Sequence, residues 1–257
     1  MRGPLCSTLC VLVASTIVGT TQHKPTSEAL ARLGEVRRAI GGDKSIAAIK
    51  SLSLGGTLRM RNQYFGRVPE ARSEFQTVNF DIKILLPDHC LERQDYQIAT
   101  RYTGFAGNTL LNRAVFRDGR VAPNSDSAST LAEHRANCGY IVLFLTLRTD
   151  TVFPFEFREA GPDTLTFRSP EGIDIAVDVD AATNLPVRFR FDTPVHSMKA
   201  GTAEKLISVL EVGDYRGGGG WHLPHRLTLS RKDRLEEERQ LDTLEVNPAL
   251  TADDFRK

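Results

Sequence analysis

The chain has 257 residues, with 33 basic and 32 acidic side chains and a formal net charge of +1. This balance argues against a nucleic-acid-binding protein, which carries a basic excess, and against a polybasic membrane-surface protein. The length suits one large β domain, since sandwiches and barrels reach about 200–250 residues in one unit.

The first 20 residues are expected to form a secretory signal peptide. Arg2 is followed by an apolar run over residues 9–18 and then by small and polar residues, which is the order of such a peptide. The run is shorter than the about 20 residues that span a bilayer, although an uncleaved anchor is an alternative. Cys6 and Cys10 do not follow the run, so lipidation is not expected. We expect a periplasmic protein with one domain over residues 27–257.

Two helices are expected next. Apolar residues at helical spacing predict a helix over residues 27–40, which Thr26 or Ser27 can cap and which Gly41-Gly42 ends. A short second helix over residues 43–50 would begin with Asp43 as its cap.

A β pattern begins at Leu52, and Gly55-Gly56 interrupts it, which suggests a bulge or bend. The next strand covers residues 75–84 and ends before Pro87-Asp88. The apolar residues on one of its faces are Val78, Phe80, Ile82 and Ile84.

The clearest hairpin lies between residues 173 and 192. One face is apolar, with Ile173, Ile175, Val177 and Val179 on the first strand and Val187, Phe189 and Phe191 on the second. The other face would pair Asp174, Asp178 and Asp180 with Arg188 and Arg190, a favourable cross-strand arrangement. We interpret these aspartates as a solvated face rather than paired catalytic carboxylates.

Later strands are expected over residues 206–215, 221–230 and 235–246, and together the strands indicate an antiparallel sheet, open or partly closed. Residues 217–220 are four glycines, interpreted as a flexible loop between strands. The charged run over residues 231–239 is interpreted as an exposed hairpin.

One segment is helical in the middle of this β pattern, over residues 128–148. Residues 140–147 are apolar all round, so this helix must be buried on most sides. Three phenylalanines follow within residues 152–157. The segment is either a central core element or the wall of a cavity for an apolar ligand.

The search for catalytic chemistry finds no recognisable constellation. His222 and His225 are three residues apart, which on a strand places them on opposite faces, so no metal site is expected. The sequence has no nucleophile elbow, phosphate-binding loop or dinucleotide fingerprint. Cys90 and Cys138 remain after signal cleavage and form either one disulfide or two buried thiols. We expect neither an enzyme nor a cofactor.

Four stretches resemble the LolA-like group of periplasmic proteins, which includes lipoprotein carriers and lipoprotein-sorting proteins. Residues 39–54 resemble the helix that leads into the first strand, and residues 180–187 resemble an Asp-x-x-Thr-Gly-Leu-Pro turn, with Asn184 in place of Gly. Residues 214–226 resemble a later hairpin, and residues 244–255 resemble the closing strand and tail. Asn tolerates the left-handed conformation that Gly supplies.

The resemblance implies a mainly β (α+β) fold, a strongly curved antiparallel half-barrel with covering helices. It also implies an apolar cavity under a helical lid that binds or shuttles a lipid or an acylated protein, with an envelope protein as a further partner. A monomer is expected. The candidate cavity residues are Tyr140, Leu143, Phe144, Leu147, Phe153, Phe155 and Phe157. The alternatives are an envelope interaction or sensor module with a filled hollow, and a hydrolase on the same scaffold.

Overall fold

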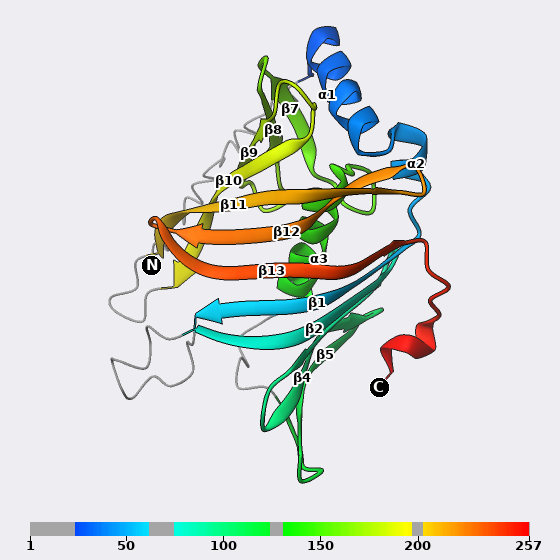
Figure 1. Cartoon of the computed structure of the whole chain (residues 1–257), viewed down its shortest axis with the longest axis vertical. Helices are drawn as coiled ribbons and strands as arrows, with labels where there is room; N and C mark the ends of the chain where they lie inside the picture. Colours follow the sequence, from blue (N-terminus) through cyan, green and yellow to red (C-terminus); the bar gives the residue numbers. More distant parts are fainter. Residues whose placement is uncertain (1–23, 62–74, 124–130, 197–202, 257) are drawn as a thin grey trace, which may run out of the picture.

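The computed structural model describes residues 24–61, 75–123, 131–196 and 203–256. Within these ranges, thirteen antiparallel strands form one open sheet in the order β6-β5-β4-β3-β2-β1-β13-β12-β11-β10-β9-β8-β7. The sheet curves strongly, and α3 lies against its concave face (Figure 1). The first and last strands pair with each other in the middle of the sheet.

The helices are α1 (Ser27–Ile40), α2 (Asp43–Ala47) and α3 (Leu131–Thr146), and a short 3-10 helix covers Ala252–Phe255. The strands are β1 (Ser51–Arg61), β2 (Phe75–Leu85), β3 (His89–Asp95), β4 (Ala99–Ala106), β5 (Thr109–Phe116), β6 (Val121–Pro123), β7 (Glu156–Ala160), β8 (Thr164–Arg168), β9 (Asp174–Val179), β10 (Pro186–His196), β11 (Ala203–Gly218), β12 (Trp221–Arg231) and β13 (Arg234–Val246). No helix among the described residues is long and apolar enough to cross a membrane.

The structure confirms the bounds predicted for the first helix, and Thr26 is its N-cap. The Thr26 Oγ1 accepts a hydrogen bond from the Ala29 N–H at 3.1 Å, which satisfies one of the free donors at the helix start. The second helix is shorter than predicted, and Asp43 is its first residue rather than its cap. The cap position belongs to Gly42, while the Asp43 carboxylate pairs with Arg37 at 3.3 Å.

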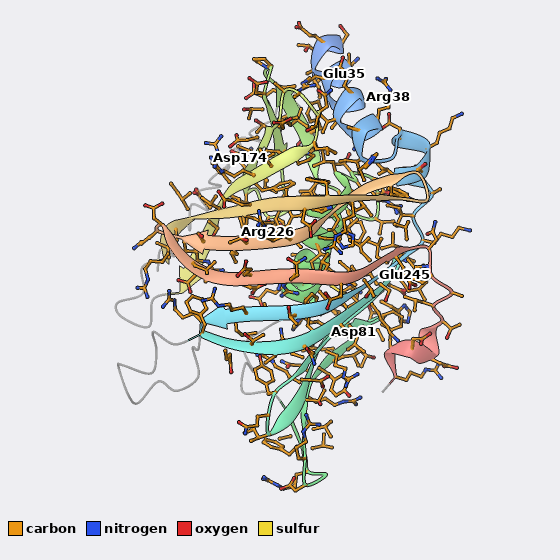
Figure 2. All side chains as sticks on the ribbon, in the orientation of Figure 1. Glu35, Arg38, Asp81, Asp174, Arg226 and Glu245 are labelled. Atoms are coloured by element: carbon orange, nitrogen blue, oxygen red, sulfur yellow. A yellow bond between two sulfur atoms is a disulfide. The ribbon has the colours of Figure 1, made fainter. Side chains whose placement is uncertain are left out.

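The sheet alternates as the sequence pattern predicts. In β1 the register against β13 shifts between Gly55 and Gly56, which confirms the expected bulge. A Cβ at Gly56 would lie 2.0 Å from the Gln240 carbonyl oxygen, so only glycine fits there. Charged side chains such as Asp81, Arg226 and Glu245 cover the convex face (Figure 2).

The β9–β10 hairpin has the expected inner and outer faces. Arg190 pairs with Asp178 at 2.7 Å on the outer face, and Asn184 adopts φ +57° in the turn. Val187 departs from the prediction because it is 40 % exposed. The register shifts between Pro186 and Arg188, which removes Val187 from the apolar face.

The prediction that residues 217–220 form one flexible loop is wrong. Gly217 and Gly218 belong to β11, where they pair with His222 and Trp221. The connection to β12 is therefore the two-residue turn Gly219-Gly220, whose φ values of +58° and +86° suit a tight hairpin turn.

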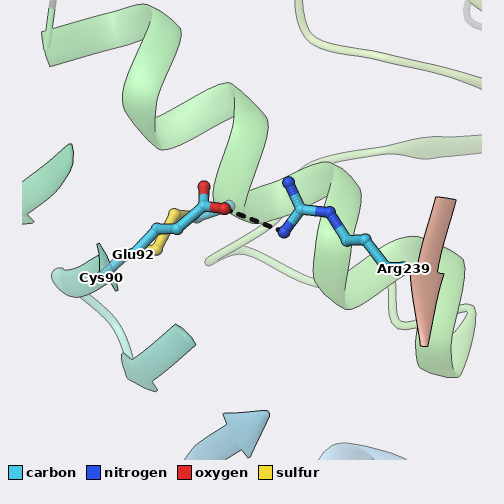
Figure 3. The surroundings of a disulfide bond; sticks show 4 residues. Cys90, Glu92 and Arg239 are labelled. Atoms are coloured by element: carbon cyan, nitrogen blue, oxygen red, sulfur yellow. Dashed lines mark ion pairs between the residues drawn. A yellow bond between two sulfur atoms is a disulfide. The ribbon is translucent and has the colours of Figure 1, made fainter. Parts of the chain in front are cut away.

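Cys90 and Cys138 form a disulfide. The bond joins β3 to the middle of α3 and so connects the helix to the concave face of the sheet (Figure 3). Of the two alternatives that the sequence left open, the structure has the bridge.

Candidate ligand-binding site

A hollow of about 450 Å³ lies between α3 and the concave face of the sheet, and we call it the apolar hollow. This volume is in the range of small-molecule sites, about 300–1,000 Å³. The apolar side chains that the strands contribute are Leu54, Phe80, Ile82, Phe191, Leu210, Leu227, Leu229 and Leu241. They come from β1, β2, β10, β11, β12 and β13, because inward-facing positions alternate along each strand.

The helix α3 presents one face to this hollow. The lining residues of α3 are three or four positions apart, as one side of a helix requires: Glu133, Ala136, Asn137, Tyr140, Ile141, Phe144 and Leu145. Other sides of the helix bury Cys138, Val142, Leu143 and Thr146 in the core. Residues 140–147 are apolar all round because the helix has both a cavity face and a core face.

Two of the seven candidate residues, Tyr140 and Phe144, line the hollow. Their ring centroids lie 6.1 and 5.6 Å from that of Phe191 on β10, so helix and sheet form one aromatic cluster.

The other five candidates lie in the core behind the helix and are not among the residues that line the hollow. Leu143 and Leu147 are fully buried. A Cβ at Gly139 would meet the rings of Phe153 and Phe155 at 3.1 and 3.3 Å, so these two phenylalanines pack where the helix has no side chain. Phe157 packs on Phe167 with ring centroids 5.4 Å apart.

The sequence analysis missed a charged group in the hollow. Arg231, Glu237 and Arg239 line it, so the charged run over residues 231–239 is not an exposed hairpin throughout. Only Lys232, Asp233 and Arg234, at its turn, are exposed as expected. The sequence did contain a signal for this position. Arg239 and Glu237 lie two and four residues before Leu241, and alternate residues of a strand share a face. Leu241 is 1 % exposed, so this face of the strand points inward.

Arg239 is the centre of this group. Its Nη1 lies 3.0 Å from the Glu92 carboxylate (Figure 3). Its Nε lies 2.5 Å from the Glu237 carboxylate. Burial alone would lower the pKa of Arg239, but the two carboxylates more than offset this, and the pKa is raised. The guanidinium also lies over the Phe80 ring, 5.1 Å from its centroid. An ion-pair cluster therefore lies among the mostly apolar side chains that line the hollow.

A second, more polar hollow of about 270 Å³ adjoins the first, and we call it the annex. Its polar lining residues are Glu92, Gln94, Arg101, Thr103, His134 and Asn137. The Cys90–Cys138 disulfide forms part of its wall. Ile82, Glu92, Asn137 and Ile141 line both hollows, so the two spaces adjoin at these residues.

No group of three or more His, Cys, Asp or Glu side chains in the described ranges is placed to hold a metal ion. The aspartates of β9 lie on the outer face of the sheet, where Asp174 pairs with Arg168 at 2.7 Å. The candidate site therefore consists of the apolar hollow and the more polar annex beside it.

Tyr140 makes the hollow sensitive to alkaline pH. Burial raises the pKa of Tyr140 from 10.0 to about 12. A raised pKa in the folded state gives stability that is present below pH 10 and is lost as the pH rises from 10 towards 12. We expect the phenol absorbance of Tyr140 to titrate near pH 12, and Tyr140→Phe to remove this component. A Tyr140 component that titrates near pH 10 would show that the ring is not buried.

Comparison with known proteins bears on the fold. No family model matches the chain, and no curated protein matches it. A DUF1329 family protein from Desulfovibrio piger is 11 % identical with a TM-score of 0.52, over 90 % of this chain and 98 % of that one. A LolA superfamily protein from Nitrosomonas europaea is 9 % identical with a TM-score of 0.50, over 89 % and 97 % of the two chains. These likenesses confirm the fold that the sequence predicts, a curved LolA-like half-barrel.

Proposed function

We propose that the protein binds or shuttles a lipid or a lipid-modified protein in the periplasm, with an acyl chain held in the apolar hollow under α3. The observation that carries this proposal is the hollow itself, because its volume of about 450 Å³ is lined mostly by apolar side chains. The LolA-like fold supports a carrier or binding role rather than an enzymatic one.

The energetics favour an acyl chain as the occupant. Each methylene group that leaves water gains about 0.8 kcal/mol, so one long chain supplies useful affinity without any polar contact. The aromatic cluster of Tyr140, Phe144 and Phe191 offers a large contact area at the helix side.

The alternative is an envelope interaction or sensor module whose hollow is filled by side chains. Phe153, Phe155 and Phe157 would fill it in that case, but all three belong to the core cluster and none lines the hollow. Their position favours the carrier.

Leu229→Gln tests the proposal. Leu229 lines the hollow and is half-buried, so the folded protein tolerates an amide there, but a bound acyl chain would desolvate it. Desolvation of an amide costs about 1–3 kcal/mol, so binding of a fluorescent fatty-acid probe should weaken about tenfold or more. Fluorescence titration measures the dissociation constant, and circular dichroism checks the fold.

Ile207→Gln is the matched control. Ile207 lies on the neighbouring strand β11 with 63 % exposure, outside the hollow. It should bind the probe as the unaltered protein does. Equal binding by the folded Leu229→Gln variant would contradict an acyl chain in this hollow.

A further inference from the structure

The annex suits an acyl chain less well than the apolar hollow, because six of its eleven lining residues carry polar or charged side chains. It adjoins the apolar hollow at Glu92 and Asn137, so a ligand with a chain in one space can place its head in the other. We propose that the annex binds the head group of the ligand and selects an uncharged head rich in hydroxyl, ester or amide groups, as in a monoacylglycerol. This inference rests on the proposed function and names the ligand class of that site.

The charged side chains where the two hollows adjoin argue against an ionic head group. Glu92 is engaged by Arg239 at 3.0 Å, and Glu237 holds the other side of the same guanidinium at 2.5 Å. A charged head group would lose its hydration here and would have to displace a partner from this cluster. Removing an ion from water without a free partner of opposite charge is unfavourable, so ionic heads of either sign are disfavoured.

The remaining polar groups suit a neutral head. Gln94 is 8 % exposed and is held in place by two bonds, one donated to Glu92 at 2.8 Å and one accepted from the Tyr96 hydroxyl at 2.7 Å. An amide has two N–H donors and two acceptor lone pairs, so it retains capacity for a ligand after these two bonds. Thr103 and Asn137 add a hydroxyl and a second amide.

His134 contributes to the same preference. Burial lowers its pKa below 6.5, and this effect exceeds the opposing influence of Glu133. At neutral pH the imidazole is therefore uncharged and adds no further cation to the annex. Arg101 is the cation of the annex, and the cluster beside it consists of Arg239, Glu92 and Glu237, so these two cations and two anions balance in formal charge.

The test compares three probes with the same eleven-carbon alkyl chain: 1-monododecanoylglycerol, dodecanoate and undecyltrimethylammonium, each below its micelle concentration. Isothermal titration calorimetry of the purified protein should give a dissociation constant for the glycerol ester at least about tenfold lower than for either ion. Thr103→Val keeps the side-chain shape and removes the hydroxyl. It should weaken the glycerol ester about fivefold and leave the two ions unchanged. Thr109→Val removes an exposed hydroxyl outside both hollows and is the matched control.

The outcomes separate the two proposals. If none of the probes binds, both the acyl-chain proposal and the head-group proposal are wrong. If all three bind with equal affinity and Thr103→Val changes nothing, the acyl hollow stands and the annex has no head-group role. Tighter binding of dodecanoate or of the ammonium probe would overturn the preference for an uncharged head.

Discussion

Replacing Cys90 and Cys138 by alanine together should lower the free energy of unfolding by about 4 kcal/mol. The disulfide closes a loop with a sequence separation of 48, and the chain-entropy relation assigns a bridge of this size about that value. The bond also joins the middle of α3 to β3, so its loss should loosen the helix that covers the hollow. Urea denaturation of the double variant measures the change, and hydrogen exchange of the α3 amides locates it.

Two controls make this prediction specific. The wild-type protein treated with a dithiol reductant should unfold at the same urea concentration as the double variant. The single variant Cys138→Ala removes the bridge while keeping one thiol, so it should lose a similar amount of stability. A loss of less than about 1 kcal/mol, or free thiols in the native protein, would contradict the bridge and its role.

Arg239→Met should lower the free energy of unfolding by about 3 kcal/mol, because it leaves two carboxylates near each other without their shared cation. The Arg239 side chain is only 18 % exposed, and those of Glu92 and Glu237 are 20 % and 30 % exposed. This partial exposure keeps the expected cost at the lower end of the range for buried pairs. Thermal and urea unfolding near neutral pH measure it.

Arg59→Met is the matched control, since Arg59 pairs with Glu238 at 3.5 Å where the two side chains are 49 % and 35 % exposed. It should cost less than about 1 kcal/mol, as exposed pairs do. Adding Glu92→Gln to Arg239→Met should restore part of the lost stability by removing one unpaired charge. Equal losses in Arg239→Met and Arg59→Met would show that the cluster is not buried.

Local patterns were sufficient for elements whose signals lie within one short segment. The helix α1 has a capping threonine, helical spacing and terminal glycines, and the structure confirms its bounds. The β9–β10 hairpin was equally predictable, from its alternating apolar and polar residues and from its turn sequence. Val187 was the exception, because a register shift depends on the partner strand rather than on the segment itself.

The candidate site was less predictable because its position depends on contacts between distant elements. An all-apolar helix carries no signal for which side meets a cavity, so residues 140–147 did not separate Tyr140 and Phe144 from Leu143 and Leu147. The pairing of Arg239 with Glu92 bridges two intervening strands of the sheet. No pattern within residues 231–239 could reveal that partner.

The strand β3 was also difficult to predict from the sequence. Its inward face carries Cys90, Glu92 and Gln94, so hydrophobic alternation does not mark this strand. Glu92 and Gln94 line the annex, where a carrier for a simple hydrocarbon would need apolar side chains. The departure from the usual pattern thus coincides with the proposed head-group site.

Native mass spectrometry of the protein, purified without detergent from cells that express it, tests the central claim most directly. Spectra are recorded before and after extraction with organic solvent. The carrier proposal predicts a discrete added mass that extraction releases as an acyl lipid or an acylated peptide. A bare protein mass, together with no binding of a fluorescent fatty-acid probe, would contradict it and leave the half-barrel as an interaction scaffold.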